Sequence, residues 1–229
     1  MVRRLIWLLL LAWGLLSAGF VLAVRRWFEE REGRGGPIPV SQAAMLLQPT
    51  RRFVMPVRTT LEWFGLQPGE IILELGPGPG YFTPEAARMA GPEGRVLCLD
   101  LQPGMLELLR TRLRTRDVTN AHLIAADATR LPLADHSVDA AFLVAVLGEI
   151  PDRPAALIEL RRVLRPGGRL SFVETLGDPD YVFVDTMKDL CRACGFQLVE
   201  HRRQLMGYVM TFTALRLDTH SPALYDRPV

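Results

Sequence analysis

A loop with three closely spaced glycines is the feature of this sequence most suited to ligand chemistry. The loop runs from Glu74 to Gly80 as ELGPGPG and follows an apolar run at 71–75. Glycines let a backbone approach a ligand closely, and α/β sheets bind nucleotides at the edge where such loops lie. A dinucleotide fingerprint has glycines at positions one, three and six, whereas here they stand at one, three and five, with Tyr81 at six. This spacing, with an acid two residues before the first glycine, favours an adenosyl ligand that has no pyrophosphate.

Two acids further along the chain also stand at or just after the end of an apolar run. Asp100 ends the apolar run 96–100, and Asp127 follows the apolar run 122–125. A carboxylate at the end of the second strand can accept hydrogen bonds from both hydroxyls of a ribose, and an acid after the third strand can meet an adenine edge. Taken singly, each acid is better explained as a solvated loop residue or a helix cap. On three successive strand ends, the acids and the glycine loop together predict a nucleoside site.

The apolar pattern around these residues predicts strands that alternate with helices. Strands are expected at 71–75, 96–100, 122–125, 138–146, 169–174, 196–201 and 208–215, and helices at 83–90, 103–116, 154–164 and 182–193. The last two strands are joined too tightly for a helical crossover, so they should be antiparallel. We therefore expect an α/β fold: a doubly wound, seven-stranded, mostly parallel sheet with one antiparallel strand near the C-terminus. Residues 41–64 should add one or two helices before the first strand.

The N-terminal residues form a separate unit in the sequence. The run 5–24 carries no charge, and its 20 residues would span about 30 Å as a helix, the thickness of a bilayer's hydrocarbon core. More arginines follow this run than precede it, which favours a cytoplasmic location for the rest of the chain. A cleaved signal peptide and a buried soluble helix are the alternatives, but the run is longer than a signal peptide's apolar region. We expect a single-pass transmembrane anchor at 1–27, a linker at 28–40 and one domain at 41–229.

Composition excludes several classes of function. The 27 basic and 25 acidic residues nearly balance, so no strong field points to a nucleic-acid partner. Lys188 is the only lysine, which excludes a lysine Schiff base at any other position. Three cysteines at uneven spacing do not form a disulfide framework, and the pair Cys191 and Cys194 lacks the further ligands of a zinc site, so no metal is expected. The oligomeric state is not indicated by the sequence.

Five segments of the chain, in order and spacing, resemble the class I S-adenosylmethionine-dependent methyltransferases. Within that family the likeness is to the type 11 group that includes the ubiquinone and menaquinone biosynthesis C-methyltransferases. The matching segments are ILELGPGPGYFT (71–82), VLCLDLQPGML (96–106), AADATRLPLADHSVDAAF (125–142), LGEIPDRPAALIELRRVLRPGGRLSFVE (147–174) and GF (195–196). One departure is Gly148, which stands where many relatives have a histidine, so a histidine proton acceptor is absent there.

The resemblance implies S-adenosylmethionine as cofactor and assigns roles to the residues of its site. Glu74 and the loop backbone would hold the methionine part, Asp100 would hold the ribose, and Asp127 with Ala128 would bind the amino edge of the adenine. Val144, at the end of the fourth strand, would line the methyl-donor pocket. The full expected cofactor site is Glu74, Gly76, Gly78, Gly80, Tyr81, Asp100, Leu101, Met105, Asp127, Ala128 and Val144.

Methyl transfer from a sulfonium needs alignment and exclusion of water, with a general base only where the acceptor must lose a proton. Glu149, Asp178 and Tyr181 are the candidates for that base. The expected acceptor is a small, apolar or membrane-associated molecule (a quinone, lipid or thiol), reached beneath an amphipathic lid at 41–64.

Two other functions are alternatives to methyl transfer. A scaffolding protein could use a methyltransferase-like domain without catalysis. An NAD(P)-dependent oxidoreductase would need a glycine at position 81 and a Tyr-x-x-x-Lys pair, and the chain has neither.

Overall fold

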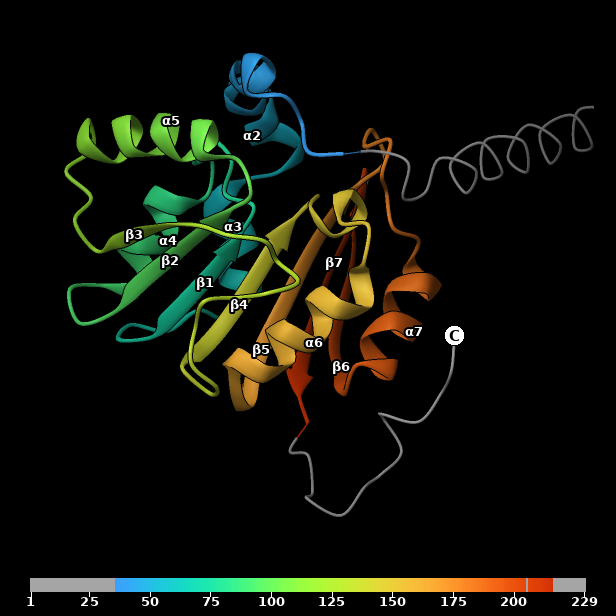
Figure 1. The fold of residues 1–229 in the computed structure, drawn as a ribbon. Helices are drawn as coiled ribbons and strands as arrows, with labels where there is room; N and C mark the ends of the chain where they lie inside the picture. Colours follow the sequence, from blue (N-terminus) through green and yellow to red (C-terminus); the bar gives the residue numbers. More distant parts are fainter. Residues whose placement is uncertain (1–35, 205, 216–229) are drawn as a thin grey trace, which may run out of the picture.

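The computed structural model of the protein describes residues 36–204 and 206–215 (Figure 1). The predicted anchor at 1–27 and most of the predicted linker at 28–40 lie outside the described residues. Within the part of the chain that is described, no helix is long and apolar enough to cross a membrane.

A seven-stranded sheet with helices on both faces forms the centre of the molecule (Figure 1). Its strand order is β3-β2-β1-β4-β5-β7-β6, and β7 runs antiparallel to both of its neighbours, β5 and β6. The predicted α/β fold, mostly parallel with an antiparallel strand near the C-terminus, is confirmed. The strands are β1 (Ile71–Leu75), β2 (Arg95–Asp100), β3 (Ala121–Ala125), β4 (Val138–Val144), β5 (Leu164–Thr175), β6 (Phe196–Gln204) and β7 (Gly207–Ala214).

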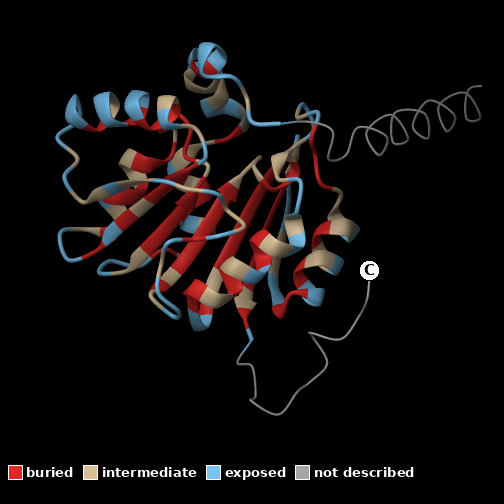
Figure 2. Ribbon diagram, in the orientation of Figure 1, coloured by how far each residue is buried: buried red, intermediate tan, exposed pale blue. Residues whose placement is uncertain are grey.

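Two apolar layers hold the helices to the sheet. On one face, small and aliphatic side chains of α3, α4 and α5 pack on the sheet around Phe142. On the other face, α6 and α7 pack around Phe172. Figure 2 shows these buried residues as a continuous band along the strands. The helices are α3 (Val57–Trp63), α4 (Thr83–Ala90), α5 (Pro103–Arg114), α6 (Arg153–Val163) and α7 (Val184–Ala193).

The segment before the first strand is more broken than the one or two helices expected there. It forms a 3-10 helix η1 (Val40–Leu47), a single turn α2 (Arg51–Val54) and α3. Pro49 and Pro56 stand between these pieces. Proline lacks the N–H that a continuing helix requires and disfavours helical geometry in the residue before it, so each one interrupts the helix.

The parallel register brings the functional residues to one edge of the sheet. Leu75, the last residue of β1, pairs with Leu99 of β2 and with Leu143 of β4. The carboxyl ends of these three strands are therefore level. The loops that leave them must meet, and ligands of open α/β sheets bind at this place.

Candidate cofactor site

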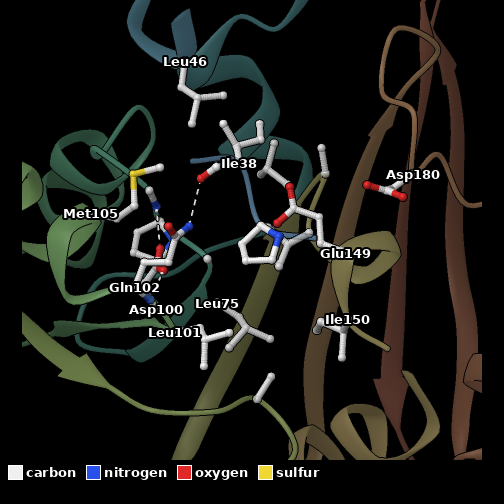
Figure 3. Close-up of a pocket in the computed structure, with 18 of the residues that line it drawn as sticks. Ile38, Leu46, Leu75, Asp100, Leu101, Gln102, Met105, Glu149, Ile150 and Asp180 are labelled. Carbon is white, nitrogen blue, oxygen red and sulfur yellow. Dashed lines mark hydrogen bonds between the residues drawn. The ribbon is translucent and has the colours of Figure 1, made fainter. Parts of the chain in front are cut away.

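A cavity of about 910 Å³ opens at the carboxyl ends of β1, β2 and β4 (Figure 3). Its volume lies within the range of small-molecule sites, about 300–1,000 Å³. Every expected cofactor residue except Gly80 lines it: Glu74, Gly76, Gly78, Tyr81, Asp100, Leu101, Met105, Asp127, Ala128 and Val144. Gly80 instead lets the loop pack on α5, because a Cβ there would lie 2.4 Å from Leu109 Cδ1.

The glycine loop and Asp100 form one hydrogen-bonded unit. The Gly78 N–H donates to Asp100 Oδ2 at 3.1 Å, and the Gln102 N–H donates to Asp100 Oδ1 at 2.9 Å. Asp100 is 7% exposed. Burial raises the pKa of its carboxyl, and the two backbone hydrogen bonds oppose that rise. The loop and the carboxylate are therefore held in place by each other before any ligand arrives.

Glu74 is buried at the base of the cavity with an unsatisfied oxygen. The residue is 3% exposed, and its Oε2 has no hydrogen-bond partner among the described residues. Burial raises the pKa of this carboxyl to about 8. A buried acceptor without a donor is costly. The amino group of the cofactor's methionine part would supply that donor, so the residues present fit the expected group.

Asp127 and the residues expected to flank the adenine, Leu101 and Met105, line the same cavity. Asp127 is exposed, and its Oδ1 accepts from both the N–H and the Oγ1 of Thr129, each at 2.8 Å. These hydrogen bonds lower the pKa of Asp127 and favour its ionised form. Met105 is buried and Leu101 is 58% exposed, and both line the cavity. Leu101 and Met105 thus offer apolar surface to a ring, and the ionised Asp127 offers a hydrogen-bond acceptor, which is the combination expected of an adenine site.

Residues 36–39 also line the cavity, which sequence reasoning missed because they fall in the expected linker. We call these residues the strap. The Ile38 carbonyl oxygen accepts from Gln102 Nε2 at 2.9 Å, and the Ile38 N–H donates to the Glu149 carboxyl. Gln102 follows β2 and Glu149 follows β4, so one residue is held from two walls of the cavity. Figure 3 shows Ile38 above the cavity with these side chains on either side.

Replacing Gln102 with leucine should loosen the strap. The substitution removes one neutral hydrogen bond, worth about 1 kcal/mol, so amide exchange over residues 37–48 should quicken about five-fold in mass-spectrometric hydrogen exchange. Gln67→Leu is the matched control, because Gln67 Nε2 donates to the Gly65 carbonyl, also at 2.9 Å, on an exposed turn. Equal exchange over 37–48 in both variants would show that the Gln102 hydrogen bond does not hold the strap.

Glu149 and Asp178 are the two proton-acceptor candidates that the structure places at the cavity. Burial, together with the negative charges of Asp178, Asp180 and Asp100, raises the pKa of Glu149 to about 8. A carboxyl with that pKa exchanges protons near neutral pH, as general acid–base catalysis favours. Burial also raises the pKa of Asp178.

Tyr181, the third candidate, does not line this cavity. It is 8% exposed and packs edge-on against the rings of Tyr208 and Phe183. Burial and the charge of Glu174 raise its pKa to about 12. Tyr181 therefore lies in the core rather than beside the candidate donor site.

The structure explains the glycine at position 148. Gly148 lies in the short 3-10 helix η2 (Leu147–Glu149), against the loop that follows β5. A Cβ on Gly148 would lie 1.7 Å from the carbonyl oxygen of Asp180. A histidine at this position would displace that loop, so the glycine permits the loop that carries Asp178 to close on this wall.

The described cysteines and acids do not form a metal centre. Within residues 36–204 and 206–215, no group of three His, Cys, Asp or Glu side chains could hold a metal ion. Cys98, Cys191 and Cys194 are free and buried. Burial raises the pKa of Cys191 and Cys194, so both stay protonated thiols.

Comparison with known proteins finds a likeness to a methyltransferase domain over the middle of the chain. Residues 73–172 match the family model described as a methyltransferase domain. Over 118 residues the chain is 37% identical to a ubiquinone/menaquinone biosynthesis C-methyltransferase of Vibrio cholerae serotype O1, a match covering 51% of this chain and 45% of that protein. The chain thus matches about half the length of such curated relatives.

Solved structures share the fold. A SAM-dependent methyltransferase from Aquifex aeolicus superposes with a TM-score of 0.74 at 21% identity, covering 78% of this chain and all of that one. The [4+2]-cyclase SpnF superposes with a TM-score of 0.63 at 18% identity, covering 70% and 80%. Because a protein named as a cyclase shares the fold, the fold alone does not set the reaction. Residues 73–172 thus match a methyltransferase domain, and the chain shares the fold of solved SAM-dependent methyltransferases. Together with the site geometry, these matches indicate S-adenosylmethionine as the cofactor.

Proposed function

We propose that this protein is a methyltransferase that transfers the methyl group of S-adenosylmethionine to a small, lipophilic acceptor at a membrane. One observation carries the proposal: the glycine loop, Glu74 and Asp100 meet at one cavity inside the part of the chain that matches a methyltransferase domain. The cavity would then hold the cofactor and also align the acceptor with it.

The bound cofactor supplies a methyl group already activated on a sulfonium, so the chain's own work is to bind, align and exclude water. Glu74 would accept a hydrogen bond from the amino group, and Asp100 would hold the ribose hydroxyls. The strap, held by Gln102 and Glu149, would cover the mouth of the cavity and keep water out.

The remaining wall of the cavity favours an acceptor with an apolar body and one ionisable group. Ile38, Leu46, Ile150 and Pro179 supply apolar surface there. Glu149 supplies a carboxyl that can take up a proton near pH 8. A quinol fits this description, and the likeness to quinone C-methyltransferases supports it. In that case Glu149 would receive the proton released by the ring carbon that is methylated, or by a hydroxyl of the quinol ring.

Two measurements test the proposal. Calorimetry with S-adenosylmethionine should show binding to the full chain, and absence of binding would overturn the proposal. Transfer of radiolabelled methyl should then be followed to a naphthoquinol, a phospholipid and an alkyl thiol. We expect the quinol to be methylated. Binding without transfer to any acceptor would favour the scaffolding function instead.

We further propose that residues 1–27 anchor the enzyme as a single-pass membrane protein with its catalytic domain in the cytoplasm. The uncharged run at 5–24 and the arginines that follow it support this. Alkaline carbonate should leave the full chain with the membrane fraction, and protease added from the cytoplasmic side should digest the domain. Release by carbonate would contradict the anchor.

A further inference from the structure

A second cavity, of about 1240 Å³, shares Tyr81 and Gln48 with the lining of the first. Helices α2, α3, α4 and the end of α5 contribute to its lining. Five arginines line it: Arg52, Arg58, Arg88, Arg112 and Arg116. We call this cavity the arginine groove. Two carboxylates, Glu85 and Asp117, lie in it as well, so its lining carries an excess of positive charge.

Three of the five cations have no ion pair in the described part of the chain. Arg58 pairs with Glu62, and Arg88 pairs with Glu85. None of the ion pairs within residues 36–204 and 206–215 involves the other three, which are Arg52, Arg112 and Arg116. The groove therefore holds unneutralised positive charge that an anion would stabilise.

Arg112 shows most directly that an anion would be favourable. Its Nε is buried and has no hydrogen-bond partner among the described residues. Burial and the like charge of Arg116 both lower the pKa of its guanidinium. An oxyanion in the groove would oppose the repulsion between the two arginines and favour the charged form of Arg112.

An exposed aromatic ring lies beside Arg52, one of the arginines that line the groove. Phe53 on α2 is 77% exposed, and the guanidinium of Arg52 lies 5.0 Å from the centre of its ring. Met45 on η1, which lines the cofactor cavity, is 50% exposed. In Figure 1, η1 and α2 stand at the same end of the molecule as α5, and Figure 2 shows exposed residues on all three. An exposed aromatic ring among arginines is the composition of a surface that binds the interface of an anionic membrane.

We propose that the arginine groove binds the phosphate of an anionic phospholipid headgroup while Phe53 enters the edge of the bilayer. Tyr81 lines both the groove and the cofactor cavity, so docking would set the mouth of the cofactor cavity beside the lipid. This site does not depend on the proposed methyl transfer. RNA fits the groove less well, because Tyr81 is the only aromatic ring in its described lining, and the Arg51 guanidinium lies over that ring at 4.7 Å.

The arginines at the end of α5 provide a test with matched charge. Four arginines alternate there; Arg112 and Arg116 line the groove, whereas Arg110 and Arg114 do not. The paired variants Arg112→Gln/Arg116→Gln and Arg110→Gln/Arg114→Gln remove the same charge from the same region. An arginine beside an anionic lipid surface contributes about five-fold in affinity, so the first pair should weaken binding about 25-fold and the second pair less than two-fold.

The experiment uses the full chain in neutral detergent, titrated with dihexanoyl-phosphatidylglycerol and followed by calorimetry. Dihexanoyl-phosphatidylcholine, inorganic phosphate and a single-stranded RNA are titrated in parallel, and circular dichroism checks that each variant is folded. We expect the phosphatidylglycerol to bind at least ten-fold tighter than the other three. Four outcomes would overturn the proposal: no binding of phosphatidylglycerol, equal binding of free phosphate, tighter binding of RNA, or equal losses in the two paired variants. Binding of S-adenosylmethionine, measured separately, should be unchanged in both pairs.

Discussion

Replacing Gly76 with alanine should reduce the affinity for S-adenosylmethionine more than 100-fold. Gly76 has a φ of +68°, and a Cβ there would lie 2.5 Å from Val146 Cγ2 and 2.8 Å from its Cγ1. The left-handed backbone costs about 1–2 kcal/mol for a residue with a side chain, and the overlap with a stiff β-branched neighbour adds about 1–3 kcal/mol. The loop must shift to relieve this strain, and it then loses the alignment of the Gly78 N–H with Asp100.

Two further variants separate strain in the loop from general destabilisation. Gly69 has a φ of +85° but nothing within 4 Å of its added Cβ, so Gly69→Ala should cost about 1–2 kcal/mol of stability and leave cofactor binding unchanged. The double variant Gly76→Ala/Val146→Ala should recover part of the affinity, because it removes the overlap and keeps the backbone cost. Calorimetry and thermal unfolding measure both quantities. Near-normal binding by Gly76→Ala alone would show that the loop does not hold the cofactor.

Replacing Glu74 with glutamine should have opposite effects on the stability of the free protein and on cofactor binding. Burial raises the pKa of Glu74 from 4.5 to about 8. The folded state therefore binds its proton more tightly than the unfolded state. The contribution of Glu74 to stability is therefore highest below pH 4.5 and falls as the pH rises towards 8, by at most about 5 kcal/mol. Glutamine stays neutral, so Glu74→Gln should unfold at a higher temperature than the natural protein at pH 8.5.

The same substitution should weaken binding of S-adenosylmethionine by about 10- to 150-fold, because a hydrogen bond to a charged group is worth about 1.5–3 kcal/mol. Glu85→Gln is the control. Its hydrogen bond to Arg88 lowers the pKa of Glu85 below 4.5, so this variant should follow the natural protein between pH 5 and 8.5. The pKa of Glu149 is also raised to about 8. The stability of Glu74→Gln should therefore still fall somewhat as the pH rises towards 8.5. Unchanged affinity in Glu74→Gln would remove Glu74 from the cofactor site.

The arginines of α5 show where reasoning from the sequence ends. Their alternation in the sequence is consistent with a solvated helix end, and α5 itself ends at Arg114, two residues before Arg116. Only the tertiary structure brings residues of α2, α3 and α4 beside Arg112 and Arg116 as the lining of one groove. The partners of a helix face come from segments far away in the chain, so the helix period cannot identify them.

The sequence alone predicted the fold and the set of residues that meet at one cavity. Three local features carried this prediction: the alternation of strands and helices, the spacing of the glycines, and the acids at strand ends. Parallel pairing then brings the carboxyl ends of the strands to one edge of the sheet. Tertiary structure alone decided that the strap reaches the cavity across 64 residues to Gln102, that Tyr181 packs in the core, and that Glu149 lies among other acids with a raised pKa. These depend on burial and on contacts between distant segments, and no local pattern in a single sequence carries that information.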